Sequence, residues 1–194
     1  MITPPLPAII HTTQKAPLER LLARQRIKRV KSFAHDRTVL DFGCGAHVWA
    51  ARELRPLCRR IDGLEPTVAA GEVHGIQIVN KLDQLHQHDY DLVIALAVFE
   101  HLHPKQLQYA LHQLAAITVP QALVVGTVPT PLARPVLELL SYRLGLIDAS
   151  QIRDHKVYYD NLCLREILSD TPWQLQFYQT FQLGMNSFFV LEKK

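Results

Sequence analysis

The sequence lacks several features that would assign it to a specialised class of protein. No apolar run reaches the length of a membrane-spanning helix, and the start Met1–Pro5 has neither the charged head nor the apolar core of a signal peptide. Only three cysteines are present, Cys44, Cys58 and Cys163, and they lack metal-ligand spacing. An odd number of cysteines argues against a disulfide framework, so we expect reduced thiols in a cytoplasmic protein.

The sequence also has a small net charge and no segment that marks a boundary between domains. Its net charge of +3 is too small to imply a nucleic-acid partner by itself. No repeat or low-complexity linker interrupts the 194 residues, which suffice for one well-buried domain and are few for two. We therefore expect a single domain over 1–194, with a lead-in and basic helix over 1–35 and an insertion over about 130–170.

Hydrophobic periodicity predicts strands that alternate with helices. One helix is expected over about 15–34, a second begins at Pro104 and ends near residue 118, and a third starts after the capping residue Asp160. The expected strands cover residues 38–42, 60–64, 75–79, 91–97, 122–128, 173–181 and 185–192. This alternation predicts a mainly parallel sheet with helices on both faces, and the short connection Gln182–Gly184 predicts a closing antiparallel hairpin.

The first expected strand ends in an acidic residue and a glycine-rich turn. Asp41 precedes Gly43-Cys44-Gly45, and such a turn lets the backbone approach a nucleotide-like ligand closely. A dinucleotide site would have its third glycine at Val48 and would bind a pyrophosphate, which Asp41 would repel. A carboxylate here suits a ligand with a cationic amino-acid end and no phosphate. S-adenosylmethionine is such a ligand.

Three segments in this order resemble the class I S-adenosylmethionine-dependent methyltransferases of the small-molecule type. They are the glycine turn, the strand Ile61–Glu65 that ends in an acid, and the strand within Asp91–Leu102 with the tail that follows it. The resemblance covers roughly residues 30–194. It implies a Rossmann-like, doubly wound α/β fold whose seven-stranded sheet is mostly parallel, with an antiparallel last strand and helices on both faces.

The resemblance also implies which residues hold S-adenosylmethionine. The backbone of Gly43, Cys44 and Gly45 would approach the methionine part, with Asp41 near its amino group. Glu65 would accept hydrogen bonds from both ribose hydroxyls, which suits the two oxygens of a carboxylate.

Other readings of these two acids stay open. Asp41 could be a strand-end acid that caps the following helix. Glu65 could be a solvated loop acid, with Asp62 taking the ribose role in its place.

The remaining cofactor contacts are expected after the third and fourth strands. We expect Leu82 to pack on the adenine and Asp83 to make a polar contact with it. Leu96 and Ala97, at the end of the fourth strand, would line the channel near the methionine chain.

One position departs from the family pattern. His47 occupies a place that is often a third glycine, and a side chain there would crowd the turn. The imidazole could contact the cofactor carboxylate or point to solvent. A competing hypothesis is therefore a methyltransferase-fold binding protein that has lost catalysis.

An acid–histidine pair, Glu100-His101, follows the fourth strand, and His155 lies beyond the fifth. Small-molecule members of the family often have an acid and histidines in these places. We expect His101 or His155 to act as a general base or to orient the substrate. The alternative is that the pair hydrogen-bonds the sheet edge and loops. No metal site is expected, because the extra glutamate of the metal-binding small-RNA methyltransferases is Ala97 here. At most, Glu100, His101 and His155 could form a three-ligand site, which would suit a transition metal better than magnesium.

The segment Arg24–Lys31 carries five positive charges in eight residues. It could contact RNA phosphates or anionic lipid, but it has no interleaved aromatic residues and is typical of a solvated helix face. We therefore expect methyl transfer to a small-molecule acceptor, at oxygen in preference to nitrogen or carbon. An RNA methyltransferase is the other competing hypothesis.

Overall fold

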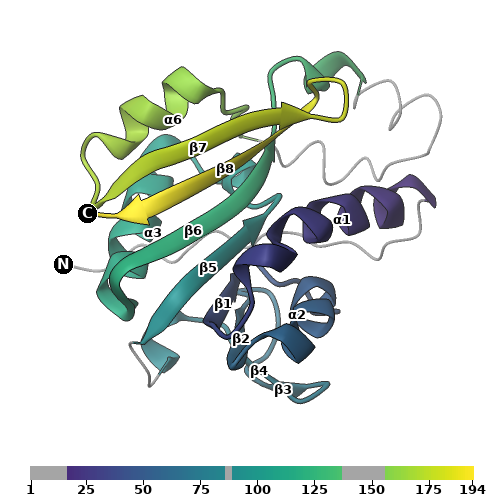
Figure 1. Ribbon diagram of the computed structural model, residues 1–194, viewed down its shortest axis with the longest axis vertical. Helices are drawn as coiled ribbons and strands as arrows, with labels where there is room; N and C mark the ends of the chain where they lie inside the picture. The colour runs from purple at the N-terminus through teal and green to yellow at the C-terminus, as the bar shows by residue number, and fades with distance from the viewer. Residues whose placement is uncertain (1–16, 86–88, 137–155) are drawn as a thin grey trace.

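The chain folds around one sheet of eight strands. The computed structural model describes residues 17–85, 89–136 and 156–194. The strands in chain order are β1 (Thr38–Phe42), β2 (Arg60–Leu64), β3 (Gly71–Val73), β4 (Ile76–Val79), β5 (Tyr90–Leu96), β6 (Thr118–Pro129), β7 (Trp173–Phe181) and β8 (Asn186–Lys193). In space their order is β3-β4-β2-β1-β5-β6-β8-β7 (Figure 1).

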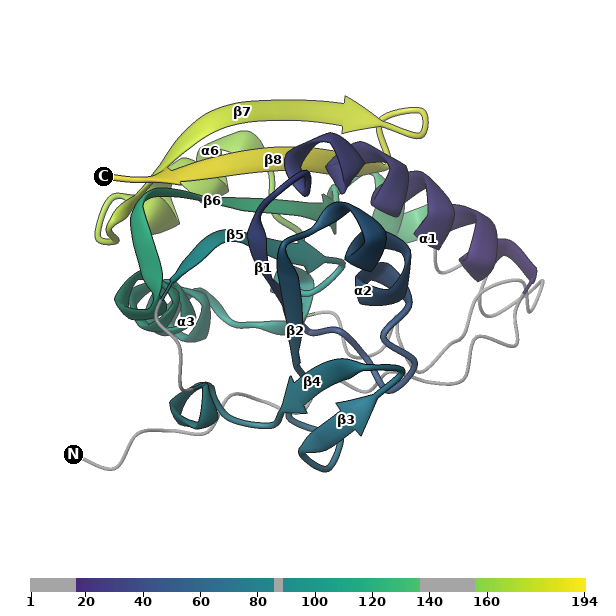
Figure 2. The ribbon, with the colours of Figure 1, turned by 60° about the horizontal axis from the view of Figure 1, so that its bottom comes forward.

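Helices cover both faces of this sheet. The α-helices are α1 (Pro17–Val30), α2 (Trp49–Leu54), α3 (Pro104–Ile117) and α6 (Asn161–Leu168). The short 3₁₀ helices are η1 (Lys31–Phe33), η2 (Arg55–Leu57), η3 (Leu82–Gln84) and η4 (Phe99–His101). Figure 2 shows α1 and α2 on one face and α3 and α6 on the other.

The predicted helix starts are confirmed. Pro104 opens α3, where its missing N–H is no loss because the first turn of a helix has no intrahelical acceptor. The Asp160 carboxylate accepts a hydrogen bond from the Cys163 backbone N–H at 2.8 Å and so caps α6.

The strand directions confirm the predicted fold class. β4, β2, β1, β5 and β6 are parallel, whereas β8 is antiparallel to β6 and β7 is antiparallel to β8. The predicted count of seven strands is one short, because β3 pairs antiparallel with β4. The turn between them places His74 and Gly75 at φ 53° and 73°. A strand of three mostly exposed residues has too little hydrophobic alternation to be predicted.

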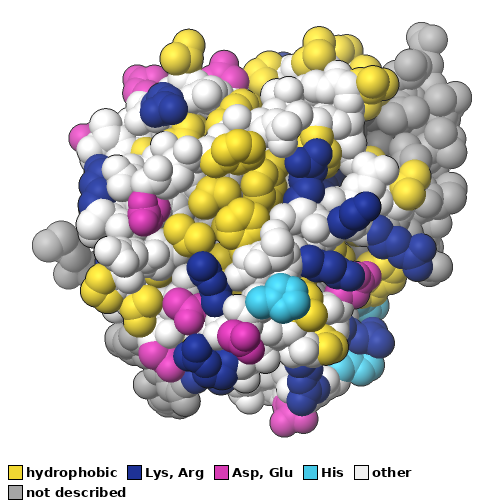
Figure 3. All heavy atoms as spheres, in the orientation of Figure 1, with side chains coloured by type: hydrophobic (Ala, Val, Ile, Leu, Met, Phe, Trp, Pro, Cys, Tyr) yellow, Lys and Arg dark blue, Asp and Glu magenta, His cyan; other side chains and the backbone are white. Residues whose placement is uncertain are grey.

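The sheet is buried on both sides where helices cover it. All five residues of β1 are buried, as expected for a central parallel strand. On the α1 face the helices leave part of β6, β8 and β7 uncovered. Phe177 is 47% exposed there, and Figure 3 shows a hydrophobic patch on this face.

Candidate functional site

The glycine turn after β1 folds over the end of β2. The backbone N–H groups of Gly43 and Cys44 both donate to the Leu64 carbonyl, at 2.8 and 3.2 Å. Gly43 and Gly45 have φ of 78° and 65°, in the left-handed region that favours glycine. The result is a glycine-rich turn with few side-chain atoms at the carboxyl ends of the strands, where open α/β sheets bind their ligands.

Glu65 follows β2 directly and its carboxylate is held against this turn. One oxygen, Oε2, accepts from the Gly45 backbone N–H at 3.1 Å. The other, Oε1, accepts from the Thr67 backbone N–H at 3.1 Å and from the Thr67 hydroxyl at 2.6 Å. The side chain is fully buried, so the reading of Glu65 as a solvated loop acid does not fit the structure.

Asp41 and Glu65 both lie close to the Cys44 thiol. Burial raises the pKa of Cys44 well above its usual range, and the charges of Asp41 and Glu65 raise it further. A thiol that stays protonated is a poor nucleophile. Gly63, which pairs with Asp41 in the sheet, makes room for it, because a Cβ there would lie 2.7 Å from Cys44 Sγ. Cys44 therefore fills space beside two carboxylates.

His47 occupies the third glycine position of the family pattern, and the unusual backbone conformation lies at the next residue, Val48. His47 is exposed and keeps a negative φ. Val48, which is buried and precedes α2, instead has φ 44° and ψ 41°. A β-branched residue in this region is strained, and the left-handed conformation in this turn lies at Val48 and not at His47.

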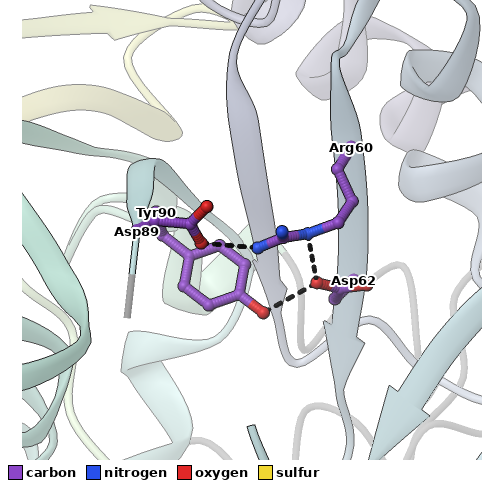
Figure 4. Close-up of polar contacts among 4 residues, drawn as sticks. All are labelled: Arg60, Asp62, Asp89 and Tyr90. Carbon is purple, nitrogen blue, oxygen red and sulfur yellow. Dashed lines mark hydrogen bonds and ion pairs between the residues drawn. The ribbon is translucent and has the colours of Figure 1, made fainter. Parts of the chain in front are cut away.

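Asp62, the alternative to Glu65, is engaged elsewhere. Its Oδ2 accepts from the Tyr90 hydroxyl at 2.7 Å and from Arg60 Nε at 3.0 Å, and Arg60 also pairs with Asp89 at 2.7 Å (Figure 4). Desolvation by burial raises the pKa of Tyr90 well above its usual range, and its hydrogen bond to Asp62 adds to this. These contacts favour Glu65 over Asp62 as the acid beside the turn.

The other expected cofactor residues lie at the same carboxyl edge of the sheet. Leu82 begins η3 after β4 and is partly buried against the core, whereas Asp83 is exposed. Leu96 ends β5, and Ala97 follows with φ 58° and donates its backbone N–H to the Thr127 carbonyl at 3.0 Å. A non-glycine residue in this conformation is another strained position beside the expected ligand site.

The acid–histidine pair is buried immediately after β5. Glu100 is 1% exposed and His101 is 6% exposed, both in η4. The Glu100 carbonyl accepts from the backbone N–H groups of Lys156 and Val157, at 2.7 and 3.2 Å, which joins the segment before α6 to the end of β5. His155, the second expected catalytic residue, lies outside the described residues.

Sequence reasoning missed two residues of this region. Thr67 orients Glu65, and the available signal was a hydroxyl residue two positions after a strand-end acid. Val48 carries the strained conformation, which no sequence pattern indicated.

A comparison with protein families matches residues 12–175 to the methyltransferase domain. This chain belongs to the methyltransferase domain family. The family prediction is therefore confirmed. A search of curated proteins finds no match.

Solved structures of methyltransferases share the fold of this methyltransferase-domain protein. Magnesium protoporphyrin IX methyltransferase from Synechocystis, with bound SAH, has a TM-score of 0.64 at 17% identity, over 96% of this chain and 91% of that one. The 1,6-didemethyltoxoflavin-N1-methyltransferase from Burkholderia thailandensis has a TM-score of 0.61 at 13% identity, over 96% and 94%. An N-methyltransferase from Bradyrhizobium japonicum, also with S-adenosylhomocysteine, has 0.57 at 15%, over 93% and 89%.

Membrane-spanning helices and metal-binding clusters are both absent from the described residues. In those ranges no helix has the length and apolar character needed to cross a membrane. The same ranges hold no cluster of three side chains suited to a metal ion.

Proposed function

We propose that this methyltransferase-domain protein binds S-adenosylmethionine at the carboxyl ends of β1 and β2 and methylates a small-molecule acceptor. The observation that carries the proposal is the Glu65 carboxylate, fixed by the Gly45 N–H and by Thr67 against the bare turn that Asp41 precedes. A buried acid held in one orientation is suited to accept from a ribose diol.

Each nearby residue then has a role in the proposed site. Asp41, 2% exposed, pairs with the ammonium group of the methionine part, in surroundings where a charge pair is stronger than in water. The turn Gly43-Cys44-Gly45 lies along the methionine part, and Glu65 holds the ribose. The bound cofactor supplies a methyl group activated on a sulfonium. The structural neighbours crystallised with SAM or SAH support this choice of ligand.

The order of the strands along the sheet edge supports the remaining proposed contacts. Leu82 packs on the adenine and Asp83 makes a polar contact with it. Leu96 and Ala97 line the channel between the cofactor and the acceptor.

We propose oxygen as the acceptor atom and His101 as the base. A hydroxyl of high pKa needs a group that takes its proton during transfer, and a histidine next to the end of β5 is suited to that task. His155 is the second proposed base. The neighbours that methylate nitrogen make nitrogen the alternative acceptor atom.

Calorimetric titration with S-adenosylhomocysteine tests the cofactor site. Wild-type protein should bind it, and Glu65→Gln should weaken binding roughly 10- to 100-fold, as expected for lost charge-assisted hydrogen bonds. The matched control is Glu72→Gln, an exposed glutamate of β3, which should bind like wild type. No binding by folded wild-type protein would refute the proposal.

The acceptor atom is tested by incubating the protein with cell metabolites and methyl-labelled cofactor, then locating the label by NMR. Labelled methyl ethers or esters support oxygen, and labelled amines support nitrogen. With an oxygen acceptor, His101→Asn should lower kcat about 100-fold while S-adenosylhomocysteine still binds. An unchanged kcat would remove His101 from the mechanism.

The RNA methyltransferase hypothesis is less well supported. Arg29 lies over the Phe181 ring, 4.1 Å from its centroid, and Lys31 pairs with Glu53 at 3.3 Å. Two cations of the basic segment are therefore used within the fold and are less suited to phosphate contacts.

A cytoplasmic location is part of the same proposal. All three cysteines are free, which suits a reducing compartment.

A further inference from the structure

Three exposed leucines from three different elements gather at one end of the molecule. Leu21 of α1 is 52% exposed, Leu132 after β6 is 62% exposed, and Leu183 in the β7–β8 hairpin is 93% exposed. We call these three residues the leucine corner. Leucines so exposed leave a considerable apolar area in water, and several together indicate an interaction surface.

Contacts across the hairpin bring the three elements together. The Thr130 hydroxyl donates to the Gly184 carbonyl at 2.7 Å, and a Cβ on Gly184 would lie 3.5 Å from Leu132. The Gln182 amide donates to the Gln25 side chain of α1. Leu21 is four residues before Gln25 and therefore shares its helix face. Figures 1 and 2 both place the hairpin beside α1.

Neither packing nor backbone conformation accounts for a leucine at position 183. Its side chain is almost fully exposed, and its φ of 57° lies in the left-handed region that favours glycine and asparagine. The residue thus exposes an apolar side chain at a position where a polar turn residue would be more stable. This combination points to binding.

Two exposed cations lie beside the leucine corner. Arg24 and Lys28 are exposed and lie three and seven residues after Leu21, on the same face of α1. The three segments that form the corner, 21–31, 130–136 and 182–186, contain no Asp or Glu. A partner that presents anionic groups above an apolar layer would match both features.

We propose that the leucine corner docks on an anionic membrane surface. The leucines enter the boundary between headgroups and acyl chains, and Arg24 and Lys28 contact the anionic headgroups. An RNA partner would use the cations but not the leucines, since bases stack on aromatic residues, which the corner lacks.

Docking would present the proposed active site to the membrane. β6 ends at Pro129 and β8 begins at Asn186 beside the corner, at the same sheet edge as the glycine turn. The acceptor is then a lipophilic small molecule taken from the bilayer. This last step rests on the proposed function, whereas docking itself does not.

Vesicle co-sedimentation of the full chain tests docking. Wild-type protein should sediment with vesicles of equal parts phosphatidylglycerol and phosphatidylcholine and much less with phosphatidylcholine alone. Leu132→Gln with Leu183→Asn should weaken binding about tenfold through lost apolar burial. Arg24→Gln with Lys28→Gln should weaken it about fivefold per charge and reduce the preference for anionic lipid.

Matched controls separate docking from general adhesion. Leu162→Gln removes a leucine of α6 that is 78% exposed, and Arg52→Gln removes an exposed cation of α2. Both should bind vesicles like wild type. Three results would each overturn the proposal. The first is an equal loss of vesicle binding in the control variants, and the second is no sedimentation of wild-type protein with vesicles. The third is an RNA mobility shift that depends on Arg24 and Lys28 but not on the leucines.

Binding of S-adenosylhomocysteine is measured on the same variants. Unchanged affinity in the corner variants shows that they fold and retain the cofactor site. Vesicle binding without S-adenosylhomocysteine binding would reject the proposed function but keep the docking surface.

Discussion

At the scale of single residues, the candidate site depends on how Glu65 is held. Its two carboxylate oxygens accept from Gly45 and from Thr67, so the side chain is oriented before any ligand arrives. Such preorganisation reduces the entropy that a flexible acid would lose on binding. Thr67 is therefore a positioning residue, acting on the ligand through Glu65.

Thr67→Val should weaken S-adenosylhomocysteine binding about three- to tenfold, the usual range for one lost hydrogen bond. Thr67→Ser keeps the hydroxyl and should bind like wild type. Calorimetry with the 2′-deoxy analogue separates positioning from folding, because the valine variant should lose less affinity for a ligand with fewer ribose contacts. An equal loss for both ligands would contradict the role given to Thr67.

At the scale of elements, the junction of β1 and β2 explains why the turn has its shape. Gly43 and Cys44 donate to the end of β2, and Cys44 packs against Gly63 of the same strand. A glycine inside a strand usually weakens it, but here it admits the thiol that supports the turn.

Gly63→Ala should lower the free energy of unfolding by about 1–3 kcal/mol, because its methyl group would overlap the Cys44 thiol. Adding Cys44→Ala should recover about 1 kcal/mol relative to the sum of the single losses. Urea unfolding of the four proteins measures this coupling. Strictly additive losses would show that the thiol and Gly63 do not interact.

Most elements, but not their contacts, could be predicted from the sequence. The buried apolar strands, Pro104 at the start of α3 and Asp160 before α6 were predictable because short-range patterns encode them. The hydrogen bond between the Gly45 N–H and the Glu65 carboxylate joins two loops that are 20 residues apart, and no local pattern indicates the left-handed conformation of Val48. The charge run 24–31 predicts a solvated helix face, and Arg24 and Lys28 are exposed, whereas Arg29 packs on Phe181.

At the scale of the whole molecule, we expect the burial of thiols and phenols to make the fold less stable in alkali. Burial raises the pKa of Cys58 to about 11 and also raises the pKa values of Cys44, Cys163, Tyr90 and Tyr159. The folded protein thus holds these protons more tightly than the unfolded chain does. Below the ordinary pKa values these groups are protonated in both states, and the free energy of unfolding is not reduced by them. It falls as the pH rises from the ordinary pKa values to the raised pKa values of the folded state.

The free energy of unfolding should therefore fall as the pH rises from 9 toward 11, the window given by Cys58. Urea unfolding at intervals through this window measures the fall. Cys58→Ser should make it shallower, because the serine hydroxyl does not ionise there. A stability that stays level or rises over the window would contradict the assignment.

The cofactor site at the tips of β1 and β2 is tested most directly by a crystal structure with S-adenosylhomocysteine. The ribose hydroxyls should lie on the Glu65 carboxylate, the amino group beside Asp41 and the methionine part along Gly43–Gly45. A ligand bound elsewhere, or one whose ribose does not reach Glu65, would contradict the proposed cofactor site.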